Sequence, residues 1–153
     1  MGIVIVVVLT VIYVLVRDRG LLPVAAAAVA AGGALLLAHV AKAIADRPRP
    51  YQAMADAVLR QQPAHGTSFP SSHTAVTVAV VIALMPFLPR ALAPVAVAYA
   101  VLVGWSRVYL GVHYPLDVLA GAGIGMAVGG AVLLALGVLF GRAEQPAVAS
   151  EVT

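Results

Sequence analysis

Five apolar segments separated by short polar stretches dominate this chain of 153 residues. They cover residues 2–16, 21–45, 70–88, 91–105 and 116–140. A helix needs about 20 apolar residues to cross the hydrocarbon core of a bilayer, and the second and fifth segments reach that length. The other three segments are shorter, so each must include flanking turns or lie tilted against its neighbours to span the membrane. Because backbone polar groups in lipid must bond internally, the pattern predicts an all-α polytopic membrane bundle of about five transmembrane helices.

Charge is too sparse for a water-soluble domain. Charged residues make up 10% of the chain, against about 25% in soluble proteins. The net charge is +3, but the basic residues form no run, so we expect no nucleic-acid partner. Cysteine is absent, which excludes disulfides and thiolate metal sites. The first apolar run lacks a basic head and a clear cleavage site, so it does not resemble a secretory signal peptide.

The domain prediction is one membrane-embedded domain over residues 1–140 and a disordered polar tail over residues 141–153. Small residues crowd the second and fifth segments, and Gly121, Gly125 and Gly129 lie four apart on one helix face. Such a face allows close approach of another helix. Two interpretations stay open: packing within the chain, or a contact surface for a homo-oligomer.

Three polar clusters stand out against this apolar background: Lys42 with Arg49, the run from Ser68 to His73, and Ser106-Arg107 with His113 and Asp117. Ionisable residues in membrane segments are candidates for function. Guanidinium groups bind phosphate oxygens in pairs, and lysine adds a compact charge. Lys42, Arg49 and Arg107 therefore predict an anion site. By contrast, we expect Arg47 and Arg60 to be solvated, with lipid headgroups or a second phosphate as the alternative partners.

The serines and histidines of these clusters suggest phosphoryl transfer. Ser71 or Ser72 suits the N-cap of the third apolar helix, whose first N–H groups would attract an anion. Asp117 follows His113 by four residues and can fix the tautomer of its imidazole, leaving the other nitrogen free to attack. A second histidine, His73, could protonate the leaving oxygen.

In order and spacing, Lys42-x6-Arg49-Pro50, Pro70-Ser71-Ser72-His73 and Ser106-Arg107-x5-His113-x3-Asp117 resemble the three signatures of the type-2 phosphatidic acid phosphatase superfamily. That family includes bacterial lipid phosphatases and, more distantly, vanadium haloperoxidases. The resemblance covers roughly residues 2–140. It implies that His113 forms a phosphohistidine, that Asp117 orients it and that His73 is the general acid. The phosphate-binding residues it implies are Lys42, Arg49, Ser71, Ser72 and Arg107.

Two departures from the family pattern are visible. Ser72 stands where the second signature often has glycine, but it keeps the backbone N–H. Many membrane members have six spanning helices, whereas this sequence predicts five, so an N-terminal helix would be absent. Neither departure removes a residue from the predicted site.

The expected function is hydrolysis of a phosphate from a lipid phosphate or diphosphate, without metal or other cofactor. The sequence around His73 and His113 looks most like bacterial undecaprenyl-diphosphate phosphatases. A phosphatidylglycerophosphate or phosphatidate phosphatase, or a phosphatase for a polyprenyl-phosphoryl sugar phosphate, would need the same residues. A polytopic protein that only binds anionic lipid or transports ions is the alternative of another class. Haloperoxidases are large soluble proteins, which excludes that activity here.

Sidedness follows from the arginines at the segment ends. In a five-helix threading, Arg17, Arg19, Arg90 and Arg142 share one side, and the three signatures share the other. If the site holds Lys42, Arg49 and Arg107, the remaining basic residues favour the first side as cytoplasmic. The prediction is a multi-pass cell-membrane protein. Its short polar segment and active site then face the extracytoplasmic side.

Overall fold

The computed structural model describes residues 20–141, and every element in that range is helical. The elements are α2 (Leu22–Ala45), α3 (Pro50–Ala53), α4 (Ser72–Leu84), the short 3₁₀ helices η1 (Met85–Phe87) and η2 (Arg90–Leu92), α5 (Ala93–Tyr109) and α6 (Pro115–Gly141). The expected segment at residues 2–16 and the tail from residue 142 lie outside the described residues. The all-helical prediction is confirmed for the described range, and the number of five spans stays a prediction.

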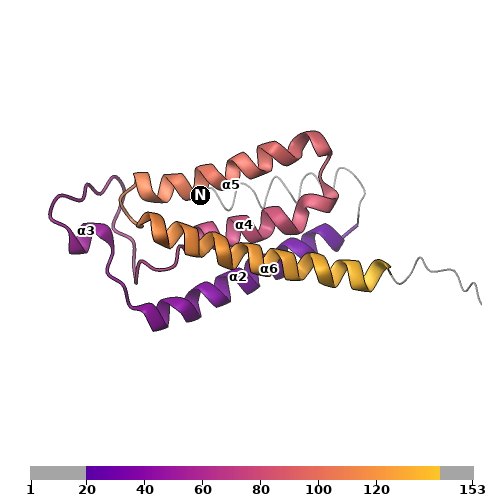
Figure 1. Ribbon diagram of the computed structural model, residues 1–153, viewed down its shortest axis with the longest axis horizontal. Coiled ribbons are helices and arrows are strands. Elements are labelled where there is room, and N and C mark those ends of the chain that lie inside the picture. Colours follow the sequence, from indigo (N-terminus) through magenta and orange to yellow (C-terminus); the bar gives the residue numbers. More distant parts are fainter. Residues whose placement is uncertain (1–19, 142–153) are drawn as a thin grey trace, which may run out of the picture.

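Three described stretches are long and apolar enough to cross a membrane: Leu22–Ala53, Arg90–Tyr109 and Pro115–Gly137. The stretch Ser72–Phe87 is equally apolar in character but shorter. This stretch can be shorter than a spanning helix that faces lipid, because α4 lies inside the bundle, packed against α2, α5 and α6 (Figure 1). Burial by neighbouring helices therefore explains how a short apolar segment belongs to this membrane fold.

Small side chains allow the close packing around α4. Ala30, Ala34 and Ala38 form a fully buried stripe on α2, and Ala75 and Ala79 face it from α4. Association of helices in lipid depends on van der Waals contact, which small residues maximise by bringing backbones together. The alanine-rich composition of the second segment thus serves the interior of the bundle.

The glycine stripe of α6 packs within the chain, the first of the two interpretations considered above. A Cβ atom at Gly125 would lie 2.6 Å from the carbonyl oxygen of Ala75, and one at Gly129 would lie 2.9 Å from that of Ala79. Both acceptors belong to α4. This face of α6 is therefore covered by α4, and a homo-oligomer through the glycine-rich helix stays an untested prediction.

One helix boundary differs clearly from expectation. The fourth apolar segment was expected to end near Trp105, but α5 continues to Tyr109. No residue between Ser106 and Tyr109 breaks a helix, and the chain turns only at Gly111, whose φ is +75°. Ser106 and Arg107 consequently lie on the last turns of a helix, not in a loop.

All the polar clusters gather at one end of the bundle. The end of α2, the short α3, the start of α4, the end of α5 and the start of α6 lie together there, while η1 and η2 join α4 to α5 at the opposite end (Figure 1). Residues 46–71 connect α2 to α4 at the first end and contain α3. The sequence predicted a polar segment over residues 46–69 of this connection. The antiparallel packing of the helices thus brings three distant signatures together.

Replacing Gly125 with alanine should lower the thermal unfolding midpoint in detergent, because the added methyl group has no space against α4. Overpacking of this kind costs about 1–3 kcal/mol. Gly123→Ala is the matched control, since nothing lies within 4 Å of a Cβ there. It should leave the midpoint unchanged or raise it slightly. Equal midpoints for the two variants would contradict the described contact of α6 with α4.

Candidate active site

A cavity of about 460 Å³ opens at the polar end of the bundle. Its lining residues are His39, Lys42, Arg49, Gln61, Ala64, His65, Gly66, Ser72, His73, Arg107, Val112 and His113. Six of the eight residues predicted for the site are among them. The other two, Ser71 and Asp117, are fully buried behind the cavity wall. Residues from all three signatures therefore surround one space of a size suited to a phosphorylated headgroup.

Arg49 is the most buried cation of the cavity, with an exposed fraction of 5%. Its Nε donates to the carbonyl of Gly66 at 3.0 Å, Nη1 to Val112 at 3.0 Å and Nη2 to His65 at 2.9 Å. A guanidinium carries five N–H donors, so two remain for a ligand. Arg49 thus links the α3–α4 connection to the α5–α6 loop while keeping donors at the cavity.

Lys42 and Arg107 approach the cavity from two other helices. Lys42 Nζ donates to the carbonyl of Thr67 at 2.8 Å and lies 3.4 Å from that of Ser68. On α5, Arg107 Nε donates to Ser106 Oγ at 3.1 Å, and that hydroxyl donates to the Val103 carbonyl at 2.7 Å. Each contact orients a cation without neutralising it, because every acceptor is uncharged.

The two serines at the start of α4, Ser71 and Ser72, have different surroundings. Ser71 is the N-cap, and its Oγ accepts from the Thr74 N–H at 3.5 Å and from the Thr74 hydroxyl at 3.1 Å. Its own backbone N–H donates to the Asp117 carbonyl at 2.9 Å. Ser71 is therefore committed to internal contacts, whereas Ser72 and His73 line the cavity.

His113 lies between the cavity and Asp117. The imidazole is 5% exposed, and its Nδ1 lies 3.5 Å from Asp117 Oδ2. That separation exceeds an ordinary N–H···O bond of about 2.7–3.2 Å, and Nδ1 has no hydrogen-bond partner. Catalytic hydrogen bonds are often long before substrate binds. Because Nδ1 faces the Asp117 carboxylate, Nε2 is the ring nitrogen that remains able to attack a phosphorus atom.

Asp117 has three other donors that the sequence did not assign to it. Arg47 Nη1 donates to Oδ1 at 3.0 Å, the Tyr114 N–H donates to Oδ2 at 2.9 Å, and the Ser68 hydroxyl also donates to Oδ2. Arg47 was expected to be solvated, and instead it pairs with this carboxylate. No pattern in the sequence signalled this contact, because the two residues are 70 positions apart in the chain.

Two further histidines reach the cavity wall. The sequence did not assign either residue to the site. His39 lines the cavity one turn before Lys42. His65 also lines the cavity, and its carbonyl accepts from Arg49. Their apolar or glycine neighbours gave no signal of this placement.

The loop between α5 and α6 carries His113 and requires a glycine. Gly111 has a φ of +75°, and a Cβ there would collide with the Val58 carbonyl oxygen. The polar segment lies across this turn, because the Arg60 N–H donates to the Leu110 carbonyl at 3.1 Å. Close backbone contact of the two loops therefore fixes the position from which His113 enters the site.

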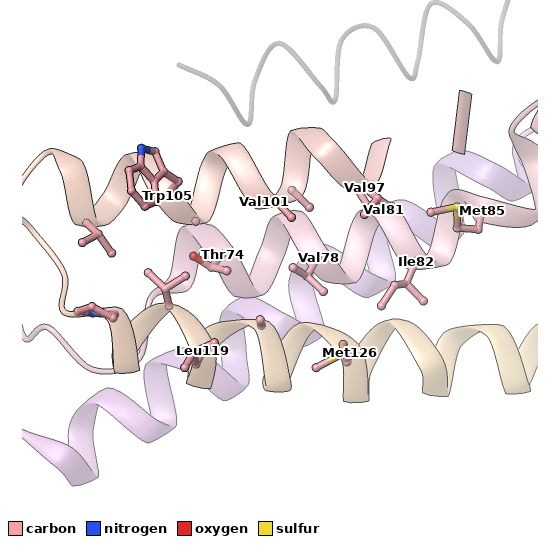
Figure 2. A pocket seen from close by; sticks show the side chains of 16 residues that line it. Thr74, Val78, Val81, Ile82, Met85, Val97, Val101, Trp105, Leu119 and Met126 are labelled. Carbon is pink, nitrogen blue, oxygen red and sulfur yellow. The ribbon is translucent and has the colours of Figure 1, made fainter. Parts of the chain in front are cut away.

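A second, apolar groove begins beside the cavity. It has a volume of about 600 Å³ and lies between α5 and α6 over α4 (Figure 2). Thr74, Val108 and Pro115 line it, and they follow His73, Arg107 and His113 closely in the chain. From that end the groove extends along the helices to Val97, Met85 and Met126. Polar cavity and apolar groove thus adjoin, as a ligand with a charged head and a hydrocarbon chain requires.

Burial lowers the pKa of the His113 imidazole from 6.5 to about 4, and the nearby Arg49 and Lys42 charges act in the same direction. Asp117 opposes the shift. At neutral pH the imidazole is therefore uncharged and keeps the lone pair that a nucleophile needs.

The fold and the site together define a helical membrane protein with a cationic, histidine-bearing cavity at one end of the bundle. The chain belongs to the PAP2 superfamily, whose family model matches residues 23–140. The resemblance seen in the three signatures is thereby confirmed.

Individual proteins agree with this assignment. The chain is 34% identical over 88 residues to an undecaprenyl-diphosphatase of Sulfolobus acidocaldarius, a match covering 58% of this chain and 43% of that protein. The crystal structure of Aquifex aeolicus LpxE matches with a TM-score of 0.70 and 31% identity, over 80% of this chain and 73% of that one. A phosphatidylglycerolphosphate phosphatase of Bacillus subtilis matches with a TM-score of 0.59 and 30% identity, over 79% and 60%.

The depressed pKa of His113 can be measured by ¹⁵N NMR of protein labelled at its histidines, titrated through the acidic and neutral range in detergent. The His113 signals, assigned by their loss in His113→Ala, should change with a midpoint near 4. The imidazole should stay neutral at every higher pH. A midpoint near the ordinary value of 6.5 would mean that water and anions reach the ring more freely than the described burial allows.

Proposed function

We propose that the chain hydrolyses the phosphate of a membrane lipid phosphate or diphosphate through a phosphohistidine. The observation that carries the proposal is the cavity itself, where three cations and two imidazoles from separate signatures meet, with a buried carboxylate behind one imidazole. Positively charged donors fixed before substrate arrives stabilise the charge that builds up on a transferring phosphoryl group. The residues proposed for binding are Lys42, Arg49, Arg107 and the Ser72 backbone.

In the first step, His113 Nε2 attacks phosphorus and the bond from phosphorus to the lipid oxygen breaks. His73 gives its proton to that departing oxygen. Asp117 accepts a hydrogen bond from Nδ1–H and stabilises the positive charge that the ring acquires. With a diphosphate, the departing group is the lipid monophosphate.

In the second step, water attacks the phosphohistidine. His73 takes a proton from the water, the bond from Nε2 to phosphorus breaks, and inorganic phosphate leaves. No metal is needed in this scheme, because Lys42, Arg49 and Arg107 take the place of a Lewis acid. Among the described residues, no three His, Cys, Asp or Glu side chains cluster as metal ligands.

The adjoining groove supports a lipid as the substrate, as opposed to a soluble phosphate ester. A charged head in the cavity would leave its hydrocarbon chain beside Thr74, Val108 and Pro115, where the groove begins. Along α4 the groove reaches from Thr74 to Met85, about 16 Å at the rise of an α-helix. That length is close to half of a hydrocarbon core about 30 Å thick. The substrate chain would then lie within one leaflet.

Undecaprenyl or another polyprenyl diphosphate is the proposed substrate class, because a curated relative carries that activity in its name. The matched region spans less than half of that relative, so the whole protein's activity is part of the proposal. Phosphatidylglycerophosphate is the second candidate, favoured by the Bacillus structure. Phosphatidate and polyprenyl-phosphoryl sugar phosphates present the same reacting group. A protein that merely bound anionic lipid would need the cations but not two histidines and an orienting carboxylate.

We further propose that the protein lies in the cell membrane with its site on the extracytoplasmic side. Of the five basic residues at the polar end, Lys42, Arg49 and Arg107 line the cavity, and Arg47 pairs with Asp117. These four act in the site and say little about orientation. Arg60 alone then remains at this end, against the four arginines that the five-helix threading of the sequence assigns to the other side. That count favours the other side as cytoplasmic.

The test is phosphate release by purified protein against a panel of lipid phosphates and diphosphates, each with and without excess EDTA. Release from at least one lipid, unchanged by EDTA, is expected. His113→Ala should reduce that release to background while leaving the unfolding midpoint unchanged. No release from any lipid, or release that EDTA abolishes and Mg²⁺ restores, would contradict the proposed chemistry.

The same assay addresses sidedness when it is run on intact spheroplasts with a short-chain, membrane-impermeant lipid phosphate. Hydrolysis without lysis is expected if the site faces outward. Inverted vesicles, in which the outer face is enclosed, should be inactive until they are opened. The reverse pattern would place the site in the cytoplasm.

A further inference from the structure

Arg47 contacts the third polar cluster through its side chain and the second polar cluster through its backbone carbonyl. Its Nη1 donates to Asp117 Oδ1 at 3.0 Å, and its guanidinium lies 4.0 Å from the centre of the Tyr114 ring. Its carbonyl oxygen accepts from the Ser68 N–H at 2.7 Å. The residue comes from the connection between α2 and α3, whereas Asp117 and Tyr114 stand at the start of α6. Arg47 does not line the cavity.

The hydrogen bonds of the Asp117 carboxylate leave little freedom. The two oxygens offer about four lone-pair sites. Arg47 occupies one site on Oδ1, while the Ser68 hydroxyl and the Tyr114 N–H occupy Oδ2 from two directions. Oδ2 is also the atom that faces His113 Nδ1. The carboxylate can therefore serve the imidazole only if its other contacts keep Oδ2 in place.

We propose that Arg47 is a positioning residue for the phosphohistidine reaction, acting through Asp117, an inference that rests on the proposed function. Arg47 holds Oδ1, so the carboxylate plane stays oriented with Oδ2 toward His113 Nδ1. The same contact supplies the positive charge that a fully buried carboxylate requires. Stacking on Tyr114 fixes the plane of the guanidinium.

The charge on Arg47 also separates its task from that of the neutral donors. Ser68 and the Tyr114 N–H can orient Asp117 but cannot balance its negative charge. The charge matters most when His113 becomes phosphorylated, because the ring then carries positive charge that an ionised Asp117 stabilises. The Arg47 side chain is 37% exposed. Its charge is thus partly hydrated, and the protein keeps it near Asp117 without the cost of full burial.

The alternative is that Arg47 only fastens the polar segment to α6. The chain offers a matched control for this possibility in Arg60. Its guanidinium lies 4.9 Å from the centre of the Tyr109 ring and donates to the Tyr109 carbonyl at 2.9 Å, with no carboxylate partner among the described residues. Arg60 thus reproduces the stacking and fastening of Arg47 without the contact to a catalytic group.

The experiment measures kcat, KM and the unfolding midpoint of Arg47→Met, Arg47→Lys and Arg60→Met, with the lipid that the panel identifies as substrate. Arg47→Met should lower kcat by about 10- to 100-fold, the size of effect that follows removal of a group orienting a metal-bound histidine or carboxylate. Its KM should change little, because Arg47 does not reach the cavity. Arg47→Lys should recover part of kcat by restoring the charge. Arg60→Met should keep both constants.

A double-mutant cycle with Asp117→Asn separates positioning from fastening. If Arg47 acts through the carboxylate charge, Arg47→Met should have almost no further effect on kcat once Asp117 is Asn. Equal losses of kcat in both backgrounds would overturn the proposal. So would an Arg47→Met variant whose kcat loss is matched by Arg60→Met.

The ¹⁵N signals of His113 give a readout that does not depend on turnover. Arg47→Met should reduce the preference for the tautomer with hydrogen on Nδ1, whereas Arg60→Met should not. If His113→Ala retained phosphatase activity while this tautomer shift occurred, the phosphohistidine mechanism would fail, and the shift would show only that Arg47 orients Asp117 toward His113. An unchanged tautomer in Arg47→Met, with His113→Ala inactive, would contradict the positioning role alone.

Discussion

The site depends on the hydrogen bonds and the ion pair that the buried carboxylate of Asp117 requires. A buried charge is costly unless its oxygens are paired and hydrogen-bonded, and its partners come from every signature. The first signature region supplies Arg47, the second supplies the Ser68 hydroxyl, and the third supplies the Tyr114 N–H. The Ser71 N–H adds a bond to the backbone carbonyl of the same aspartate. Satisfying this one group therefore draws together segments that are far apart in sequence.

Packing of small residues makes that convergence possible. Alanines on α2 and glycines on α6 allow both helices to approach α4 closely, so their polar ends meet at one end of the bundle. The cations then serve two purposes at once. Arg49 bonds three backbone carbonyls of neighbouring loops and still presents donors to the cavity. The same guanidinium therefore holds the loops in place and offers hydrogen-bond donors to an anion in the cavity.

Much of this architecture could be predicted from the sequence, because apolar length and signature spacing are local properties. The second segment was placed within one residue of α2, and six predicted site residues line the cavity. The end of α5 was missed, since Ser106 and Arg107 were interpreted as polar loop. The pairing of Arg47 with Asp117 was missed for another reason. A contact between residues 70 apart depends on tertiary packing, and no local pattern encodes it.

The proposed mechanism depends on a covalent bond between His113 and phosphorus. The most direct measurement is mass spectrometry of protein quenched in alkali during turnover, where phosphohistidine survives and phosphoserine or acyl phosphate is lost. The account predicts a phosphoryl group on the peptide that contains His113, accumulating further in His73→Ala if the water attack is slowed. A phosphoryl group on another residue, or turnover without any phosphoenzyme under conditions that preserve it, would contradict the account.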